Sequence, residues 1–466
     1  MRNATHAATH ATTHAATLAT LIAGIFLSMS AHSADLLQVY REALANDAPF
    51  ASARASLSAG QERVIQGRAN ILPVIGITGN VGRSTQDLER RSIEQRGSWN
   101  GNGYTVSLTQ PLVRFANWEL YQQGRLATAL SESLFEQARQ DIMVRVSQAY
   151  FDVLTAQDAL TSVQAQKVAI TEQLAFAKRN FEVGTTTITD THEAQARYDL
   201  SVAQEFAAIN DLEIKRTALE QIIGTSPATL QGLRPGVKLN PPMPAQIESW
   251  VSSAERQNYN VLSQQFNVEI ARREIRRNRA GHLPTLDLVA SRSHAYSGDS
   301  LAGGGSSKGN TNNIGVQYSI PLFAGFSVTS RVREAIALEE KSRADLENVR
   351  RSAAQSARQS YLGVNNGLAQ IRALEAAEIS STSALESNRL GYEVGVRINI
   401  DVLNAQQQLY STRRDLARAR YDTVMNGLRL KAAAGTLTEE DLAAINSLLE
   451  YSQPLGLLPA QAFPIR

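Results

Sequence analysis

Two copies of one unit, displaced by 211 residues, make up most of this chain of 466 residues. The sequence FEVG at 181–184 returns as YEVG at 392–395. Further residues recur in pairs at the same offset: Tyr150 and Tyr361, Asp190 and Asp401, Ala194 and Ala405, Gly224 and Gly435, Leu72 and Leu283. A fixed period of this kind indicates a repeated structural unit. We therefore expect two equivalent halves, at 35–250 and 251–436.

Each copy contains a long run without proline, at 112–226 and 322–453. A proline inside a helix costs about 3 kcal/mol, so such runs permit very long helices. From Ala127 to Val163, apolar residues recur every three or four positions and draw one stripe along a helix face. We predict helices over 49–70, 116–182 and 188–223 in the first copy, and over 253–281, 327–393 and 400–434 in the second.

The predicted helices are too long for a compact domain. At about 1.5 Å per residue, the helix over 116–182 would be on the order of 100 Å long. In each copy, the two shorter helices placed end to end come close to the length of the long one, so we expect them to pack along it. An ordinary coiled-coil rod would show the same periodicity. If only the helices are considered, such a rod is the alternative interpretation.

Between the short and the long helices, the apolar period changes to two. Ile75, Ile77 and Val81 alternate with small polar residues, and Ile314 and Val316 do the same in the second copy. Segments of about ten residues with this pattern are typical of transmembrane barrel strands, apolar toward lipid and polar toward a lumen. We predict strands over 71–83, 103–112, 283–292 and 313–322, joined by exposed loops at 84–102 and 292–312.

A soluble sheet with one buried face would show the same alternation. Four strands, however, are too little sheet to organise helices of this length. In a membrane the sheet could not leave open edges, because each unpaired backbone group in lipid costs several kcal/mol. Four strands cannot close, since about eight make the smallest common barrel. We therefore predict an α+β membrane protein whose transmembrane β-barrel is shared among at least two identical chains; three chains would give twelve strands.

The first residues are typical of a signal peptide, which we assign to 1–34. Arg2 supplies a positive charge, the stretch 18–27 is apolar, and small residues at 31–34 offer a cleavage site. The net charge of +2 argues against nucleic acid as a partner. The absence of cysteine excludes disulfides, thiolate metal sites and a lipidated N-terminal cysteine. Outside the leader only three widely separated histidines remain, so neither a metal nor another cofactor is expected.

These features together resemble the TolC family of outer membrane efflux proteins over essentially the whole mature chain. The resemblance rests on Gln110, Pro111 and Leu112 and their counterparts Ile320, Pro321, Leu322 and Phe323. It also rests on the two Val-Gly turns, and on YEVGVR at 392–397 leading into DVLNA at 401–405. Single pieces are weak signals, but their order and repetition are strong.

The resemblance implies a homotrimer with a twelve-stranded barrel in the outer membrane and a twelve-helix tunnel across the periplasm. The segments 225–250 and 437–466 would form a belt around the middle of the tunnel and a C-terminal tail. The partners would be a periplasmic adaptor protein and an inner-membrane pump, driven by ATP (ABC type) or by protons. The channel itself would conduct drugs or secreted proteins passively, without covalent chemistry.

The resemblance also implies a gate at the periplasmic helix tips. Matched to the family motif, Asp190 would pair with Tyr392, and Thr189 with Arg397. Asp190 also lies in the first turn of a predicted helix, where a carboxylate stabilises the helix by about 0.3–1 kcal/mol without any gating role.

Asp401 would project into the bore and give a ring of three carboxylates. The family's closest members carry a second acid three residues later, where this chain has Asn404, so that ring would be polar but uncharged. The loss of this second charge argues against strong blockage of the entrance by cations. The family counterparts of Gly184 and Gly395 lie where the adaptor docks, although glycine at these positions also ends a helix at low cost.

Three other functions are less compatible with the sequence. A general diffusion porin needs far more strands per chain and no long helices. A structural periplasmic coiled-coil protein would not need strands with alternating polarity. An enzyme is the least compatible, because no catalytic constellation and no phosphate-binding glycine loop ahead of a helix appear. The nature of the cargo, drug or protein, is left open.

Overall fold

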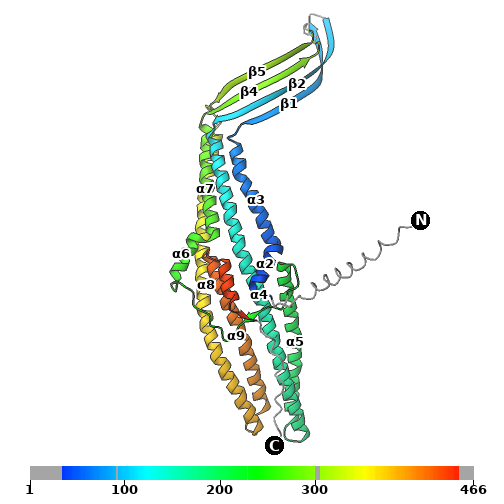
Figure 1. Ribbon diagram of the computed structural model, residues 1–466, viewed down its shortest axis with the longest axis vertical. Coiled ribbons are helices and arrows are strands. Elements are labelled where there is room, and N and C mark those ends of the chain that lie inside the picture. Colours follow the sequence, from blue (N-terminus) through cyan, green and yellow to red (C-terminus); the bar gives the residue numbers. More distant parts are fainter. Residues whose placement is uncertain (1–33, 91–92, 228, 300–304, 451–466) are drawn as a thin grey trace, which may run out of the picture.

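The molecule is a long array of helices with a four-stranded sheet at one end (Figure 1). This computed structural model describes residues 34–90, 93–227, 229–299 and 305–450. The predicted signal peptide, apart from its last residue, and the end of the tail from 451 onward lie outside the described residues.

The two halves of the helical part have the same plan. In the first half, α3 (Ala48–Ala69) and α5 (Ile188–Ile223) both pack on the long helix α4 (Phe115–Glu182). In the second half, α7 (Tyr259–Arg279) and α9 (Asn399–Ala433) both pack on α8 (Ser327–Glu393). Helix α4 also contacts α7 and α9, which joins the halves. Two short helices thus run along each long one.

The prediction of one helix over 253–281 is wrong, because two helices occupy this region. Helix α6 (Ile247–Gln257) ends before Asn258, whose backbone is extended. The Asn258 side chain accepts a hydrogen bond from the backbone N–H of Asn260 at 2.9 Å and donates one to the carbonyl of Ala433 at 2.9 Å. Asn258 therefore caps α7 and fixes it to the end of α9. After α7, a 3₁₀ turn spans Ala280–His282.

The strands are longer than predicted. They are β1 (Val74–Arg90), β2 (Ile93–Val113), β4 (Thr285–Ser297) and β5 (Ser307–Ser319), all antiparallel in the order β1-β2-β4-β5. Most of the predicted loops 84–102 and 292–312 is therefore strand, with pairing continuing to Arg90 opposite Ile93 and to Ser297 opposite Ser307. The ladder uses backbone groups only, so polar side chains that face water do not end it.

One face of this sheet is apolar and uncovered. The register places Ile75 opposite Leu108, Leu108 opposite Ala290, and Ala290 opposite Ile314, so these side chains share a face. Ile314 is 81% exposed and Val81 is 89% exposed. Both outer strands, β1 and β5, leave one edge unpaired within the described residues.

An ion pair joins the sheet to the helices. Arg114, directly before α4, donates two hydrogen bonds to Asp287 of β4, at 2.7 Å and 2.5 Å. Asp287 is nearly buried, so its charge needs this partner. No helix in the described part of the chain is both long enough and apolar enough to cross a bilayer.

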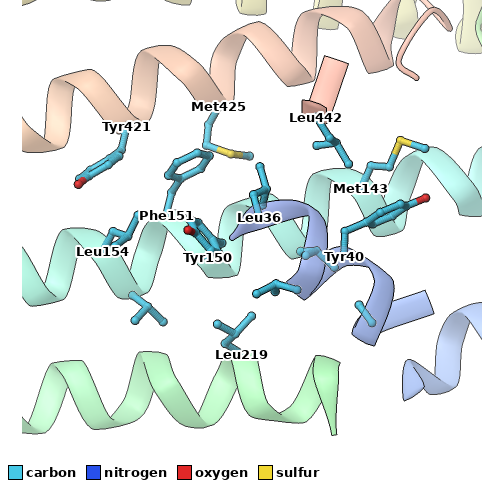
Figure 2. Packing of buried hydrophobic residues seen from close by; sticks show 14 of the residues in the cluster. Leu36, Tyr40, Met143, Tyr150, Phe151, Leu154, Leu219, Tyr421, Met425 and Leu442 are labelled. Atoms are coloured by element: carbon cyan, nitrogen blue, oxygen red, sulfur yellow. The ribbon is translucent and has the colours of Figure 1, made fainter. Parts of the chain in front are cut away.

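The main hydrophobic core lies near the middle of the helices. There, α4, α5 and α9 meet two short helices that the sequence analysis did not predict, α2 (Leu36–Asn46) and α10 (Glu439–Asn446). Figure 2 shows Tyr40 of α2, Tyr150 and Phe151 of α4, Leu219 of α5 and Met425 of α9 converging. A small sheet of β3 (Gly232–Leu233) and β6 (Leu449–Glu450) borders this core, so the predicted belt segments also meet here.

Between this core and the sheet, helices α3 and α4 approach each other closely at glycine residues. A Cβ atom on Gly124 would lie 2.5 Å from the carbonyl oxygen of Arg63, and one on Gly67 would lie 3.1 Å from that of Leu120. These backbones are close enough that side chains do not fit between them.

We predict that Gly124→Leu lowers the stability by about 1–3 kcal/mol, because the larger side chain forces the helices apart. The midpoint of thermal unfolding, followed by circular dichroism, should fall. The control is Gly427→Ala in α9, where a Cβ meets nothing within 4 Å. This control should leave the midpoint unchanged or raise it, since alanine favours helix by about 0.5–1 kcal/mol. An unchanged midpoint for Gly124→Leu would contradict the close packing.

Candidate functional site at the helix tips

The two long helices end in the same turn, at the end of the molecule remote from the sheet (Figure 1). Gly184 and Gly395 have φ angles of 76° and 79°. Their backbone N–H groups donate to the carbonyls of Phe181 and Tyr392, at 3.0 Å and 3.1 Å. The left-handed backbone favours glycine, because a side chain there is strained. Each chain thus presents two equivalent helix hairpins, α4–α5 and α8–α9.

Both turns expose apolar side chains. Val183 is 72% exposed in the first turn, and Val396 is 75% exposed in the second. Val394, Ile398 and Leu390 are each more than 60% exposed. A cluster of bare aliphatic side chains at a helix tip is costly in water and is typical of a surface that a partner covers.

Asp401 and Asn404 line one groove between α8 and α9. This groove has a volume of about 520 Å³ and is also lined by Arg397. A carboxylate oxygen of Asp401 lies 3.6 Å from a guanidinium nitrogen of Arg397, with both side chains partly exposed. The side-chain oxygen of Asn404 accepts a hydrogen bond from Arg197 of α5 at 3.0 Å. The acid at 401 and the amide at 404 therefore share one face of α9.

The structure brings Tyr392 close to Asp190. The Tyr392 ring packs edge-on against Phe176 of α4, with the ring centroids 5.8 Å apart. Burial raises the pKa of Tyr392, the Asn180 side chain lowers it, and the negative charge of Asp190 raises it. The hydroxyl is buried and has no hydrogen-bond partner of good geometry within the described residues. A direct bond to Asp190 therefore stays a prediction.

Thr189 and Arg397 are not joined within the described chain. Arg397 turns instead to Asp401 on its own side of the tip, and its side chain is 59% exposed. It therefore retains donors for a further acceptor. The predicted link between Thr189 and Arg397 is untested by these contacts.

Asn399 is a tip residue that the sequence analysis missed. It is fully buried at the first position of α9. Its amide nitrogen donates to the backbone carbonyl of Asp190 at 3.3 Å, and its oxygen accepts a hydrogen bond from Gln173 of α4. The repeat offset sets Asn399 against Ile188, so a polar residue replaces an apolar one at an equivalent position. That departure from the repeat is the signal that could have identified it.

Besides Asn399, hydrogen bonds from Arg197 of α5 to Asn404 and Gln407 of α9 and one small apolar cluster hold the two hairpins together at the tip. A small apolar cluster joins α4, α5 and α9; it consists of Ile170, Leu174, Ala177, Ala194 and Leu403. It is much smaller than the core at the middle of the helices. Few buried contacts mean that local opening costs little free energy, so the tips are the part of the helical region best suited to move. The described residues contain no cluster of acidic and histidine side chains that could hold a metal ion.

Comparison with known proteins gives consistent matches. A family model for outer membrane efflux proteins matches residues 39–225 and 250–436, which are the two repeats. The proteases secretion protein PrtF of Dickeya chrysanthemi is 35% identical over 90% of this chain and 92% of its own length. The outer membrane protein TolC of Escherichia coli (strain K12) is 32% identical over 94% of this chain and 90% of its own.

Solved structures have the same fold. The outer membrane protein VceC from Vibrio cholerae has a TM-score of 0.73 at 18% identity, covering 86% of this chain and 96% of that one. The CmeC outer membrane channel of Campylobacter jejuni has a TM-score of 0.74 at 17% identity, covering 89% of this chain and 90% of that one.

We predict that Asn399→Ala loosens the tip. The substitution removes one hydrogen bond to the Asp190 carbonyl and leaves the Gln173 amide without its acceptor, which costs about 1–3 kcal/mol. Hydrogen–deuterium exchange at the start of α5 and α9 should speed up about 5- to 100-fold, without change in the core segment of α4. Gln408→Ala is the control, because that side chain is exposed and its hydrogen bond, to Thr412, stays within α9, so its loss should change exchange at most twofold. Equal exchange in the Asn399→Ala variant and the parent would rule out this bridge.

Proposed function

The chain belongs to the outer membrane efflux protein family, and on that premise we propose that three copies of it share one closed β-barrel and one helical tunnel. It is an exit duct of the outer membrane that serves efflux and type I secretion. The helical part lies in the periplasm. The trimer and the details of its gate are the proposal.

The open sheet is the observation that carries this proposal. Its apolar face is exposed, and β1 and β5 each have a free edge within the described residues. In lipid these free N–H and C=O groups need partners. Because the order is β1-β2-β4-β5 with all neighbours antiparallel, β5 of one copy and β1 of the next would also pair antiparallel. Three copies would bring twelve strands, enough to close a barrel with an open lumen.

The rival functions fit these observations less well. A general diffusion porin would close its barrel within one chain. A periplasmic coiled-coil protein would have no use for an uncovered apolar sheet face. The family is one of transport proteins, so an enzymatic role has no support from it.

We also propose that the tips dock a periplasmic adaptor protein, which connects the duct to an inner-membrane ABC or proton-driven pump. Gly184 and Gly395 support this, because they shape two equivalent turns whose valines are exposed. Two relatives, PrtF and the alkaline protease secretion protein AprF of Pseudomonas aeruginosa, are named for protease secretion. Proteins are therefore included in the cargo that we propose.

The proposed gate consists of polar links at the same tips. Asp190 and Tyr392 would hold the α8–α9 hairpin to the α4–α5 hairpin, and Arg397 would reach Thr189 of a neighbouring copy with its free donors. Asp401 would line the narrow entrance as a ring of three carboxylates, and Asn404 would add an uncharged ring beside it.

We predict that Arg397→Ser raises the single-channel conductance in planar lipid bilayers, because a link that closes the entrance is lost. Arg389→Ser is the matched control: Arg389 lies on α8, is exposed, and pairs with Glu393 four residues on at 3.5 Å. Arg397 pairs with Asp401 in the same way at 3.6 Å. The control should conduct like the parent. Unchanged conductance in Arg397→Ser would count against the gate assignment.

Cation block tests the ring at Asp401. A trivalent cation added from the periplasmic side should block the parent channel, and Asp401→Asn should relieve that block. Asn404→Asp should tighten the block at least tenfold, since it places a second carboxylate ring in the same groove. Asn404→Gln, which keeps the ring neutral, is the control. Equal block in all four proteins would mean that neither residue faces the bore.

A further inference from the structure

We propose that the outward face of the sheet holds phosphate groups of outer-leaflet lipids through Arg83, Arg292 and Lys308. This inference rests on the proposed barrel, because it takes the apolar side of the sheet as the side that faces lipid. It concerns the region where that side changes from apolar to polar, on the part of the strands farthest from the helices.

The register shows where the apolar band ends on each strand. On β1 the apolar residues of this face run from Ile75 to Val81, whereas on β5 they run from Tyr318 to Ile314. Residues that pair across all four strands form a row, and Ile75 and Ile314 lie in the same row. From this row the band runs away from the helices on β1 but toward them on β5, so it lies closer to the helices on β5. A band that crosses the rows obliquely is expected when strands tilt by about 35–45° in a bilayer.

Cationic side chains follow the end of this band. Arg83 is the next residue on this face of β1 after Val81, and Arg292 is the next on β4 after Ala290. On β5, Lys308 follows Ile314 after two asparagines. All three cations are exposed. The tilt of the band places Arg83 and Arg292 at the same boundary although they lie in different rows, whereas Lys308 lies three rows beyond Ile314, farther out on the same face.

These charges are not neutralised by the protein. No ion pair joins a carboxylate to Arg83, Arg292 or Lys308 anywhere in the described residues. Arg83 donates a hydrogen bond to the hydroxyl of Ser98 at 2.8 Å, which orients it without removing its charge. Asp87 is the carboxylate farther out on this face, and Arg96 pairs with it at 2.7 Å. The uncompensated charge at the boundary is thus positive.

The surroundings of these cations suit a lipid headgroup. His294 Nδ1 donates a hydrogen bond to the side-chain oxygen of Asn310 at 2.7 Å, and its ring stacks on Tyr104 with the centroids 5.5 Å apart. Aromatic rings with a polar edge are favoured at the level of headgroups. At the other end of the band, Phe323 and Phe326 are 76% and 74% exposed. Aromatic side chains therefore mark the periplasmic boundary, and cations mark the outer one.

Phosphate is the anion that fits best. The guanidinium group of arginine presents its donors in a planar fork that matches phosphate oxygens. The outer leaflet of an outer membrane is rich in phosphorylated glycolipids. A cation near such an anionic surface strengthens binding about fivefold. We therefore expect three uncompensated cations on each chain to bind these lipids specifically, beyond simple solvation of the barrel.

The test measures binding of lipid A, a diphosphorylated glycolipid, to the full-length channel in neutral detergent. Its dephosphorylated form is the reference ligand. The variant carries Arg83→Gln, Arg292→Gln and Lys308→Gln. The matched control removes three exposed cations from the helices, by Arg41→Gln, Lys178→Gln and Arg372→Gln. Single-channel conductance is measured for every protein.

The parent should bind lipid A at least tenfold more tightly than its dephosphorylated form, and 500 mM salt should weaken this binding. The triple sheet variant should lose about a hundredfold in affinity, whereas the helix control should lose at most twofold. Arg292→Lys, which keeps the charge, should retain most of the binding.

Equal binding of the two ligands by the parent, or equal losses in both triple variants, would overturn the lipid site. Conductance separates this failure from failure of the proposed function. A parent channel that conducts but does not prefer lipid A contradicts only the lipid site. A parent that forms no conducting channel contradicts the barrel itself.

Discussion

Unpaired backbone groups at the two edges of one small sheet are the constraint on which the rest of this molecule depends. Strands β1 and β5 end the sheet with free edges within the described residues, and its apolar face is uncovered. In lipid, only identical neighbours can supply the missing hydrogen bonds without a new element in the chain. In the proposed trimer, the shared barrel would then fix the arrangement of the helices, because each chain continues from its strands into α4 and α8.

The buried contacts that stabilise the helices are concentrated at their middle and sparse at their tips. This distribution suits a duct that opens at one end. The large aromatic and aliphatic side chains gather in the middle, where α2 and α10 close the core. The ion pair of Arg114 with Asp287 secures the end next to the sheet. The far tips rely on a small cluster and on the hydrogen bonds of Asn399 and Arg197. Movement at the tips therefore need not disturb the core or the sheet.

The helices were predictable from the sequence, and local polar details were not. Proline-free runs with a helical period gave the helix over 188–223 with its observed bounds. The strand lengths were underestimated, because the hydrophilic side chains far from the helices conceal backbone pairing that depends on no side chain. The break at Asn258 lies at the position that the repeat sets against Asp47, the cap of α3, so the repeat could have located it. The bridge at Asn399 depends on Gln173, a partner far away in sequence that no local pattern encodes, and only a departure from the repeat marks it.

The most direct test of the account is the mass of the mature chain extracted from outer membranes in mild detergent. Native mass spectrometry should give one main species with three times the mass of the chain, and this species should separate into single chains only after heating. A single chain that stays in solution without detergent would contradict the account, because its sheet edges would then need no partner.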